Sequence, residues 1–401
     1  MFPAENGDAF LINVDSKNIL IDMGYSTTYN KYIKDRLIEL NNKNQSIDLL
    51  VITHIDEDHI EGAIEFFKDN GNVNSPRIIK VNEIWYNSYR NLQFDKDKVS
   101  NISKFEKGKL EEIMLSNSNN NKTSQCEISD ISVRQGSTLA GYLYGLGYSV
   151  CNWNSLFDNN CVNLDYKNEI NLGNFKIFIL SPNTKKLKSL SKLWMNKLQE
   201  IDMDFQISNE NFFDDAFEMF IKKIKSCDEI DEYSDISFNS ESMLKILEEK
   251  ILPVKKDTSI SNGASISFIL EYKEKKLLFL GDAHEDIIIE NLERYKVIKG
   301  DLDFEVVKIS HHGSLKNNFK WIDIIKVKKY LISTNGTKHN HPDKKVIAKI
   351  LKSHNEKKTL YFNYQLDLCK ILNENPLKNK YNYEIIVGDE NSSLEIEVFD
   401  R

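Results

Sequence analysis

Hydrophobic and polar positions alternate in a regular way through the first fifty residues of the chain. Ala9–Val14 and Ile19–Asp22 have the composition of strands, and the polar turn Asp15–Asn18 separates them. Apolar residues recur at helical spacing over Tyr32–Leu40. Ile47–Thr53 is an almost continuous apolar run, which predicts a buried strand. This order of strand, turn, strand, helix and strand indicates an α/β fold.

The same strand-rich pattern returns later in the chain. The segments that we expect to form strands are residues 175–180, 266–270, 277–280, 306–309 and 330–333, with one or two closing strands over residues 383–398. Polar residues or glycine follow most of them, so the candidate functional residues lie where strands end. Open α/β sheets place their sites at the carboxyl ends of strands.

Two segments read as insertions into a single domain of residues 1–401. Residues 85–168 are rich in Asn, Ser, Tyr and Gly and show weak periodicity, whereas residues 184–256 are helical. The second segment carries apolar stripes that we interpret as helix core: Leu187, Leu190, Leu193, Trp194, Leu198, Ile201; Phe213, Phe217, Phe220, Ile221, Ile224; Leu244, Ile246, Leu247. It leaves the domain after Ser181-Pro182 and returns at Asn262, so we expect it to lie near the site and limit substrate size.

Composition narrows the class of protein. The chain has 401 residues, 40% hydrophobic and 28% charged, which suffices for a full core without disulfides. The formal net charge of -8 argues against a protein that coats duplex nucleic acid, although bound metal ions can still neutralise phosphates locally. Five scattered cysteines without a CxxC pair predict reduced thiols and a cytoplasmic protein. No apolar stretch approaches the length of a membrane span, so we expect no membrane partner.

The strongest chemical signal is the run from Thr53 to His59. His54, Asp56, Asp58 and His59 place four metal-ligand side chains in one loop directly after a buried strand. Imidazole nitrogens and carboxylate oxygens bind divalent ions. The alternative is a solvated acidic turn, but the apolar strand before the run and the predicted helix start after it favour a metal site.

Two further signals follow later strands. Asp282 comes directly after residues 277–280, where one carboxylate could bridge two ions. His311 and His312 follow residues 306–309, and adjacent residues beyond a strand point in different directions. One of the pair can therefore ligate metal while the other faces substrate. A turn aspartate and a pair of surface histidines are the alternatives.

Two histidines of a fourth segment, which opens a helix over Lys345–Leu351, differ in their expected roles. His341 is a candidate phosphate contact or proton donor. For His339 a surface position is the better interpretation. His284 and His354 are interpreted as surface or helix histidines.

These features resemble the metallo-β-lactamase superfamily, and most closely the nuclease domain of the ComEC DNA-uptake proteins and their stand-alone relatives. The residues that carry the resemblance occur in order: Gly7-Asp8-Ala9, Ile19 to Gly24, Thr53 to His59, Asn262 to Ser265, Leu280-Gly281-Asp282, Lys308 to Ser314, and His341-Pro342. The resemblance implies an αββα sandwich with the metals at the edge between two sheets. It also implies that Asp22 lies beneath the site as a structural residue.

The chain departs from the typical pattern of that superfamily. Asp56 stands where a histidine is usual, and Ser181 stands where a further histidine ligand is expected. The first metal position is therefore poor in nitrogen, which favours manganese or magnesium over zinc there. We expect one or two divalent ions, zinc or manganese, with magnesium as a third option.

The resemblance implies hydrolysis of a phosphodiester or related phosphate ester by metal-activated water. Asp58 would ligate metal and orient the water, His312 would ligate metal, and His311 and His341 would contact the phosphate or protonate the leaving group. DNA or RNA is the first expected substrate. A cyclic nucleotide or phosphocholine ester comes next, then a lactam, lactone or thioester, and a non-catalytic partner-binding module is the remaining alternative. The sequence does not indicate an oligomeric state.

Overall fold

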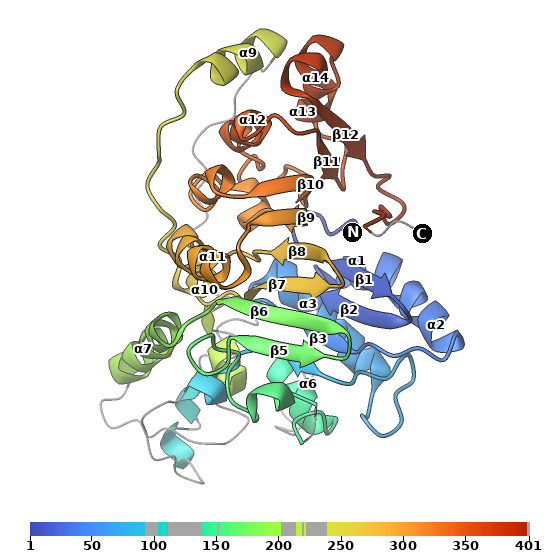
Figure 1. Cartoon of the computed structure of the whole chain (residues 1–401). Helices are drawn as coiled ribbons and strands as arrows, with labels where there is room; N and C mark the ends of the chain where they lie inside the picture. The colour runs from blue at the N-terminus through green and yellow to red at the C-terminus, as the bar shows by residue number, and fades with distance from the viewer. Residues whose placement is uncertain are drawn as a thin grey trace. The chain divides into compact units, whose positions relative to one another are not determined.

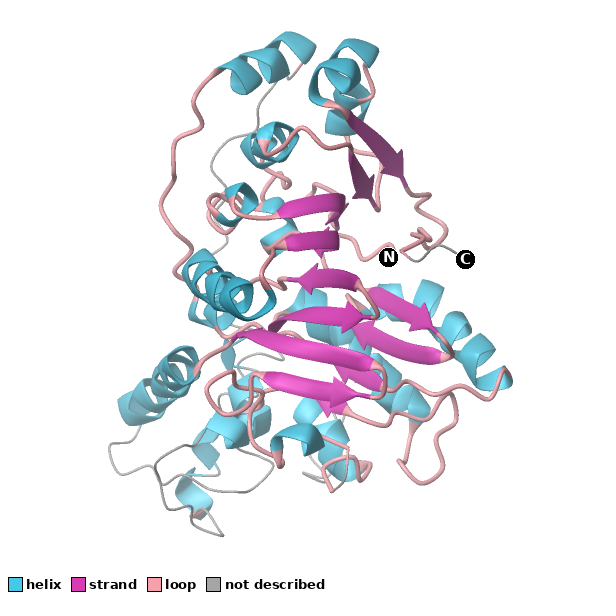
Figure 2. Ribbon diagram, viewed as in Figure 1, coloured by secondary structure: helices cyan, strands magenta, loops and turns pink. Residues whose placement is uncertain are grey.

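The computed structural model describes residues 1–92, 103–106, 108–110, 138–150, 152–201, 214–218, 220–221 and 239–398. Within these residues the chain forms a mixed α/β fold with two sheets (Figures 1 and 2). The α/β class expected from the hydrophobic pattern is confirmed.

A four-stranded sheet is built from the amino-terminal region in the order β1-β2-β3-β4. Its strands are β1 (Phe10–Val14), β2 (Lys17–Ile21), β3 (Leu49–Val51) and β4 (Ile84–Trp85). The pairs β2–β3 and β3–β4 are parallel. Because β2 and β3 run the same way, Asp22 and the run from Thr53 to His59 leave the sheet at the same edge.

An eight-stranded sheet has the order β12-β11-β10-β9-β8-β7-β6-β5. Its strands are β5 (Glu169–Leu172), β6 (Phe175–Ser181), β7 (Ser267–Tyr272), β8 (Lys275–Phe279), β9 (Asp303–Lys308), β10 (Lys326–Ile332), β11 (Lys358–Phe362) and β12 (Tyr383–Val387). The strands from β8 to β12 are mutually parallel, whereas β5 to β8 pair antiparallel. The carboxyl ends of β8, β9 and β10 therefore share one edge.

Helices and single turns connect these strands. They are α1 (Ser26–Thr28), η1 (Tyr29–Ile33), α2 (Lys34–Asn42), α3 (Glu57–Asn70), η2 (Tyr89–Leu92), α6 (Leu139–Gly145), η3 (Ser155–Phe157), α7 (Thr184–Ile201), α9 (Ser240–Glu248), α10 (Ile260–Gly263), α11 (Glu285–Lys299), η4 (His311–Gly313), η5 (Trp321–Asp323), α12 (Lys344–Lys352), α13 (Asp367–Leu372) and α14 (Asn375–Tyr381). Within the part of the chain that is described, no helix combines the length and apolar character that a membrane span requires.

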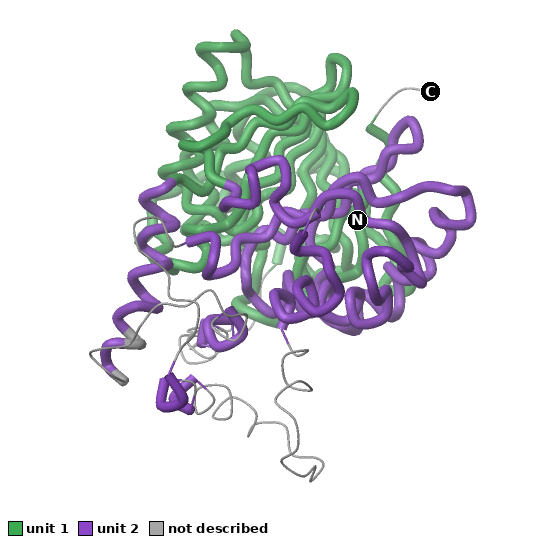
Figure 3. Tube along the Cα trace, turned by 90° about the horizontal axis from the view of Figure 1, so that it is seen from below, with its two compact units in different colours: residues 1–11, 163–183, 231–401 green, residues 12–162, 184–230 purple. Residues whose placement is uncertain are grey.

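The chain divides into two compact units, each built from segments distant in sequence (Figure 3). Unit 1 comprises Met1–Leu11, Asn163–Asn183 and Asp231–Arg401. Unit 2 comprises Ile12–Val162 and Thr184–Ile230, so the division falls inside β1.

The structure places most of the strands expected from the sequence within a few residues of their predicted ends. The carboxyl-terminal prediction was too long, because β12 ends at Val387 and residues 388–398 form no strand. β11 and the short helices α13 and α14 were not foreseen. β11 lies inside the sheet between β10 and β12, and its short apolar run carried no helical or alternating signal.

The helical prediction for the second insertion is supported where the structure describes it. Leu187, Leu190 and Trp194 of α7 are buried, as their spacing predicts. In α9 the buried side chains are Met243 and Leu247, whereas Leu244 and Ile246 are partly exposed. Phe213 and Ile224, and the side chains of Leu198 and Ile201, lie outside the described residues.

Candidate metal centre

Asp22 organises the first group of candidate ligands at the edge of the four-stranded sheet. Its carboxylate is fully buried and accepts hydrogen bonds from the Thr53 backbone N–H at 2.8 Å and the Thr53 hydroxyl at 2.7 Å. It also lies 2.8 Å from Nδ1 of His59. Because a carboxylate only accepts, Nδ1 of His59 carries the proton and Nε2 keeps its lone pair, as a metal-binding histidine requires.

Helix α3 fixes the direction in which His59 points. Glu57 and Asp58 occupy its first turn, where acidic groups suit the helix dipole, and His59 follows on the buried face. The helix approaches the backbone after β2 so closely that a Cβ on Gly62 would meet the carbonyl oxygen of Met23 at 2.1 Å. Only glycine permits this contact, so Gly62 allows His59 to reach Asp22.

His54 and Asp56 face one another within the same run. Nε2 of His54 lies 2.9 Å from Oδ2 of Asp56, and Nδ1 of His54 lies 3.0 Å from the Thr53 hydroxyl. Both side chains are nearly buried, with 2% and 6% of their surface exposed. The His54 and His59 rings are 4.2 Å apart between centroids. A divalent ion could replace the His54–Asp56 hydrogen bond by binding the same nitrogen and oxygen.

Asp282 is the centre of the second group, which gathers at the carboxyl ends of β8 and β9. Its backbone N–H donates to the Ser265 hydroxyl at 3.0 Å, and its side chain is 3% exposed. One of its oxygens, Oδ2, lies 3.8 Å from Nε2 of His311 and 3.9 Å from Nε2 of His312. These distances suit ligands that can close around an ion at about 2.0–2.3 Å from each.

His312 is held in the same manner as His59. Its Nδ1 lies 3.0 Å from the Ser333 carbonyl oxygen and 3.5 Å from an Asp8 carboxylate oxygen. Both partners are acceptors, so Nδ1 donates and Nε2 is left with its lone pair. The buried ammonium of Lys308 forms an ion pair with Asp8 and lies 3.9 Å from Oδ1 of Asp282. It balances part of the negative charge that these carboxylates bring into the protein interior.

His341 follows β10 and lies near the histidine pair, with its ring centroid 5.6 Å from that of His311. Its Nδ1 is buried and finds no hydrogen-bond partner among the residues that the structure describes. Burial lowers the pKa of His341 well below its usual value, and the neighbouring histidines His311, His312 and His339 lower it further. A neutral ring at neutral pH favours a hydrogen-bonding role over proton donation.

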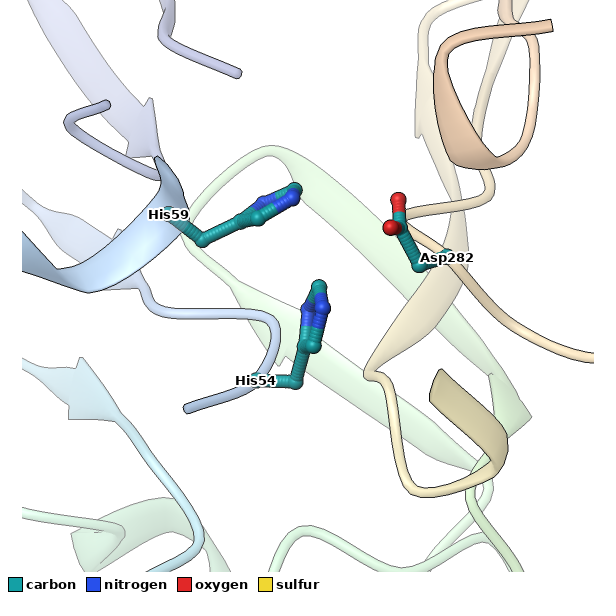
Figure 4. Close-up of side chains that lie close together, drawn as sticks. All are labelled: His54, His59 and Asp282. Atoms are coloured by element: carbon teal, nitrogen blue, oxygen red, sulfur yellow. The ribbon is translucent and has the colours of Figure 1, made fainter. Parts of the chain in front are cut away.

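Three groups of side chains could hold a metal ion, and the ligand atoms of each group lie within 4.8 Å of one another. The groups are His54, His59 and Asp282; Asp58, His59 and His312; and Asp8, Asp22 and His59. Figure 4 shows the side chains of His54, His59 and Asp282. The donors are imidazole nitrogens and carboxylate oxygens, which fits a divalent cation. Asp58 is the most accessible of them, with 18% of its side chain exposed.

The structure therefore gives every sequence-predicted ligand a position. His54, Asp58, His59, Asp282 and His312 fall within these groups, while Asp56 enters through its contact with His54. His311 lies beside Asp282, and His341 lies beside His311. His339 is only partly buried, and His284, expected on a surface or helix, is the N-cap residue of α11 with 13% of its side chain exposed.

Four polar residues at this edge had no individual role assigned from the sequence. Asp8 and Lys308 occur only within motifs of the resemblance, and Asp257 and Asn317 lie in none of the motifs. The Ser181 hydroxyl is also buried and has no hydrogen-bond partner within the described part of the chain. Nothing in the local pattern around Asp257, a polar stretch that follows Lys255 and Lys256, signals a role in the site.

Comparison with known families gives a match to the amino-terminal part of the chain. Residues 3–111 of the 401 match the family model of the metallo-beta-lactamase superfamily. The matched region contains Asp22 and the whole run from Thr53 to His59. No curated protein sequence matches the chain.

Proposed function

We propose that this chain is a metal-dependent hydrolase of phosphate esters, with phosphodiesters as its first substrates. The superfamily match of residues 3–111 suggests a metal-dependent hydrolase, and the groups of His and Asp residues could bind the metal. The proposed ligands are His54, Asp56, Asp58, His59, Asp282 and His312. The likeness to the ComEC-type nuclease domain, which no comparison tests, supplies the finer choice of substrate.

The observation that carries the proposal is the 2.9 Å contact between Nε2 of His54 and Oδ2 of Asp56. It puts an oxygen donor beside the first histidine of the run, where the superfamily typically has nitrogen. Asp58 and Asp282 add two further carboxylates. Oxygen-rich sites suit hard ions such as manganese and magnesium, and hard ions suit the charged oxygens of phosphates.

A bound divalent ion would activate water and neutralise charge on the phosphate. The protein's own residues would supply position and proton handling. Asp58, the most exposed of the carboxylates, would orient the attacking water. His311 in its imidazolium form, with hydrogen on both nitrogens, and the neutral ring of His341 would contact the non-bridging oxygens, and the lowered pKa of His341 suits a neutral hydrogen-bonding partner.

The choice among phosphate esters rests on analogy, so we place DNA and RNA first and small esters second. A protein of net charge -8 must neutralise a polynucleotide locally, which the bound ions would do. A cyclic nucleotide or a phosphocholine ester would need less neutralisation. A β-lactam offers one polarised carbonyl, for which three carboxylate ligands are poorly suited.

The test is a hydrolysis screen of the full chain after chelation and reloading with Mn²⁺, Mg²⁺ or Zn²⁺. The substrates are bis-p-nitrophenyl phosphate, single- and double-stranded DNA, RNA, a cyclic nucleotide and nitrocefin. We expect metal-stimulated cleavage of bis-p-nitrophenyl phosphate, strongest with Mn²⁺, and negligible nitrocefin turnover. Efficient nitrocefin hydrolysis without phosphodiesterase activity under any metal refutes the proposal, and a protein that binds metal but cleaves nothing points to the non-catalytic alternative.

A further inference from the structure

The ring of His311 is held on one side by polar residues from two other segments. Its Nδ1 lies 3.2 Å from Oδ1 of Asn317 and 3.6 Å from Oδ2 of Asp257. Nδ2 of Asn262 is 3.5 Å away. On the opposite side of the ring, Nε2 faces Oδ2 of Asp282. Polar contacts therefore hold the ring at Nδ1, while Nε2 faces the candidate metal centre.

Asp257 is the common partner of this group. Its carboxylate accepts from Nδ2 of Asn262 at 2.8 Å, from Nδ2 of Asn317 at 2.9 Å and from the Ser259 backbone N–H at 2.8 Å. Its side chain is 8% exposed. Burial alone would raise the pKa of Asp257, but hydrogen bonds and the charge of His311 outweigh it and hold the pKa below its usual value. Asp257 is thus a carboxylate and a pure acceptor.

These contacts decide where the proton of a neutral His311 lies. Nδ2 of Asn317 donates to Asp257 and to the backbone carbonyl oxygens of Asp282 and Ala283, so the atom that Asn317 turns toward Nδ1 is its acceptor Oδ1. Nδ2 of Asn262 donates to Asp257 at 2.8 Å, and its 3.5 Å contact with Nδ1 is longer than that of Oδ1 of Asn317. An imidazole nitrogen between two acceptors carries hydrogen. Nδ1 is then the donor, and Nε2 presents its lone pair toward Asp282.

The neighbouring imidazole of His284 does not compete for this role. Its Nε2 lies 3.9 Å from Oδ1 of Asp257 but 2.8 Å from the Ser259 carbonyl oxygen. Nε2 of His284 therefore donates its hydrogen bond to the closer acceptor, the Ser259 carbonyl oxygen. Asp257 therefore directs its remaining acceptor capacity toward Asn317 and His311.

We propose that Asp257 is a positioning residue for His311: with Asn317 it keeps Nδ1 protonated and aims the Nε2 lone pair at the candidate metal centre. The catalytic consequence rests on the proposed hydrolase function, whereas the orientation itself does not. Asp257 lies in the segment that follows α9, where the helical insertion returns to the domain. This segment therefore helps to orient a side chain of the site.

The direct test is nitrogen NMR of the metal-free full chain labelled with ¹⁵N-histidine, at a pH where the rings are neutral. Asp257→Ala is compared with wild type, and His311→Asn assigns the signal. We expect the Nδ1–H form of His311 in the wild type and a shift toward the Nε2–H form in Asp257→Ala. Asp303→Ala, which removes an exposed carboxylate on β9, is the matched control and should change nothing.

An unchanged His311 tautomer in a folded Asp257→Ala protein overturns the proposal. If that variant does not fold, Asp257→Asn provides the test, because it keeps the shape of the side chain but turns one acceptor into a donor. A mixed tautomer population is expected there, and a pure Nδ1–H population would equally contradict the assignment.

Kinetics separate this proposal from the proposed function. With Mn²⁺ and bis-p-nitrophenyl phosphate, Asp257→Asn should lower kcat by about 10- to 100-fold, as loss of a supporting hydrogen bond commonly does. KM should change little, because Asp257 lies behind His311. If the wild type cleaves no phosphate ester, the proposed function fails while the NMR result still decides the role of Asp257. An Asp257→Asn enzyme with unchanged kcat rejects the catalytic consequence.

Discussion

The two groups of candidate ligands are assembled in opposite ways. At the edge of the four-stranded sheet, the run from Thr53 to His59 supplies several donors from one loop, and Asp22 supports them from the parallel neighbouring strand. At the edge of the eight-stranded sheet, the candidate ligands Asp282 and His312 follow different strands. The residues that surround them are His311, which is adjacent to His312, and Asp8, Asp257 and His341, which come from three further segments of the chain. The first group needs correct local structure, whereas the second needs the correct order of strands.

Both groups nevertheless hold residues in strained backbone conformations. Asp22, His311 and His312 have φ angles of 52°, 44° and 51°, in the left-handed region that residues other than glycine rarely adopt. Each such residue costs of order 1–3 kcal/mol, which the surrounding hydrogen bonds must offset. Left-handed non-glycine residues cluster at functional sites. Here Asp22 follows β2, and His311 and His312 follow β9.

The largest expected effect tests whether both groups serve one reaction. Asp58→Ala removes a donor from the local run, and Asp282→Ala removes the centre of the dispersed group. Each should lower kcat/KM for bis-p-nitrophenyl phosphate by about 10²–10³-fold or more, because a donor is lost and buried charge is left unbalanced. Steady-state rates with Mn²⁺ provide the measurement.

Each of these substitutions has a neighbouring control. Glu57→Ala changes the exposed carboxylate beside Asp58 in the first turn of α3, and Asp286→Ala changes an exposed one in the first turn of α11. Both controls should keep nearly full activity. If only the Asp58 variant were inactive, the dispersed group would have no part in the chemistry.

The next effect concerns Asp22, which orients a candidate ligand and is not itself a proposed ligand. Asp22→Asn would replace an oxygen that accepts from Thr53 or His59 with a donor, and so would disturb the orientation of His59. We expect metal affinity to fall by roughly 10- to 100-fold, measured by competition with a chromophoric chelator. Asp48→Asn is the control, since Asp48 accepts from Asn18 and Lys17 before β3 begins. It should lower stability without changing metal affinity.

This contrast also explains what could be predicted from the sequence. The ligand run was evident because a buried strand, four donors and a helix start are contiguous. Strand positions followed from apolar runs, and the histidine pair followed from its place after β9. Asp257 and Asn317 could not be found, because their importance arises from the fold that brings them to His311. Local patterns also do not predict that β11 lies between β10 and β12.

A smaller effect tests the packing that supports the local run. Gly62→Ala would place a Cβ 2.1 Å from the Met23 carbonyl oxygen, which is backbone and cannot rotate away. Helix α3 must then shift, at a cost of about 1–3 kcal/mol in the free energy of unfolding. Chemical denaturation measures this cost. Gly145→Ala in α6 is the control, because a Cβ there meets nothing within 4 Å, and an equal loss in both variants would contradict the packing argument.

The pH dependence of stability tests another dispersed assembly, outside the ligand groups. Asp215 accepts from Thr138, a residue distant in sequence. Burial raises its pKa from 3.8 to about 8, with help from the charges of Glu218 and Asp214. The folded protein therefore binds a proton that the unfolded chain releases. The stability this provides is fully present below pH 3.8 and is lost as pH rises toward 8, at up to about 1.4 kcal/mol per pH unit.

Asp215→Asn should flatten this pH dependence, because the amide resembles the protonated acid and cannot ionise. Melting temperatures measured from pH 5 to pH 9 should fall less steeply for the variant than for the wild type. Asp158→Asn, which changes a carboxylate in an exposed turn, is the control and should leave the slope unaltered. Parallel curves for Asp215→Asn and wild type would show that Asp215 ionises normally in the folded protein.

The last comparison concerns the two histidines that follow β10, of which His339 has the smallest expected effect. His341 has a buried Nδ1 and a ring 5.6 Å from that of His311, whereas His339 is only partly buried and adopts a left-handed φ of 54°. Asparagine tolerates that conformation well, so His339→Asn should change stability by less than about 0.5 kcal/mol and kcat/KM by less than about twofold. His341→Asn should lower kcat on bis-p-nitrophenyl phosphate by about tenfold or more, because a phosphate contact would be lost. The same assay on both variants provides the test: a larger loss from His339→Asn than from His341→Asn would mean that His339, and not His341, contacts the substrate.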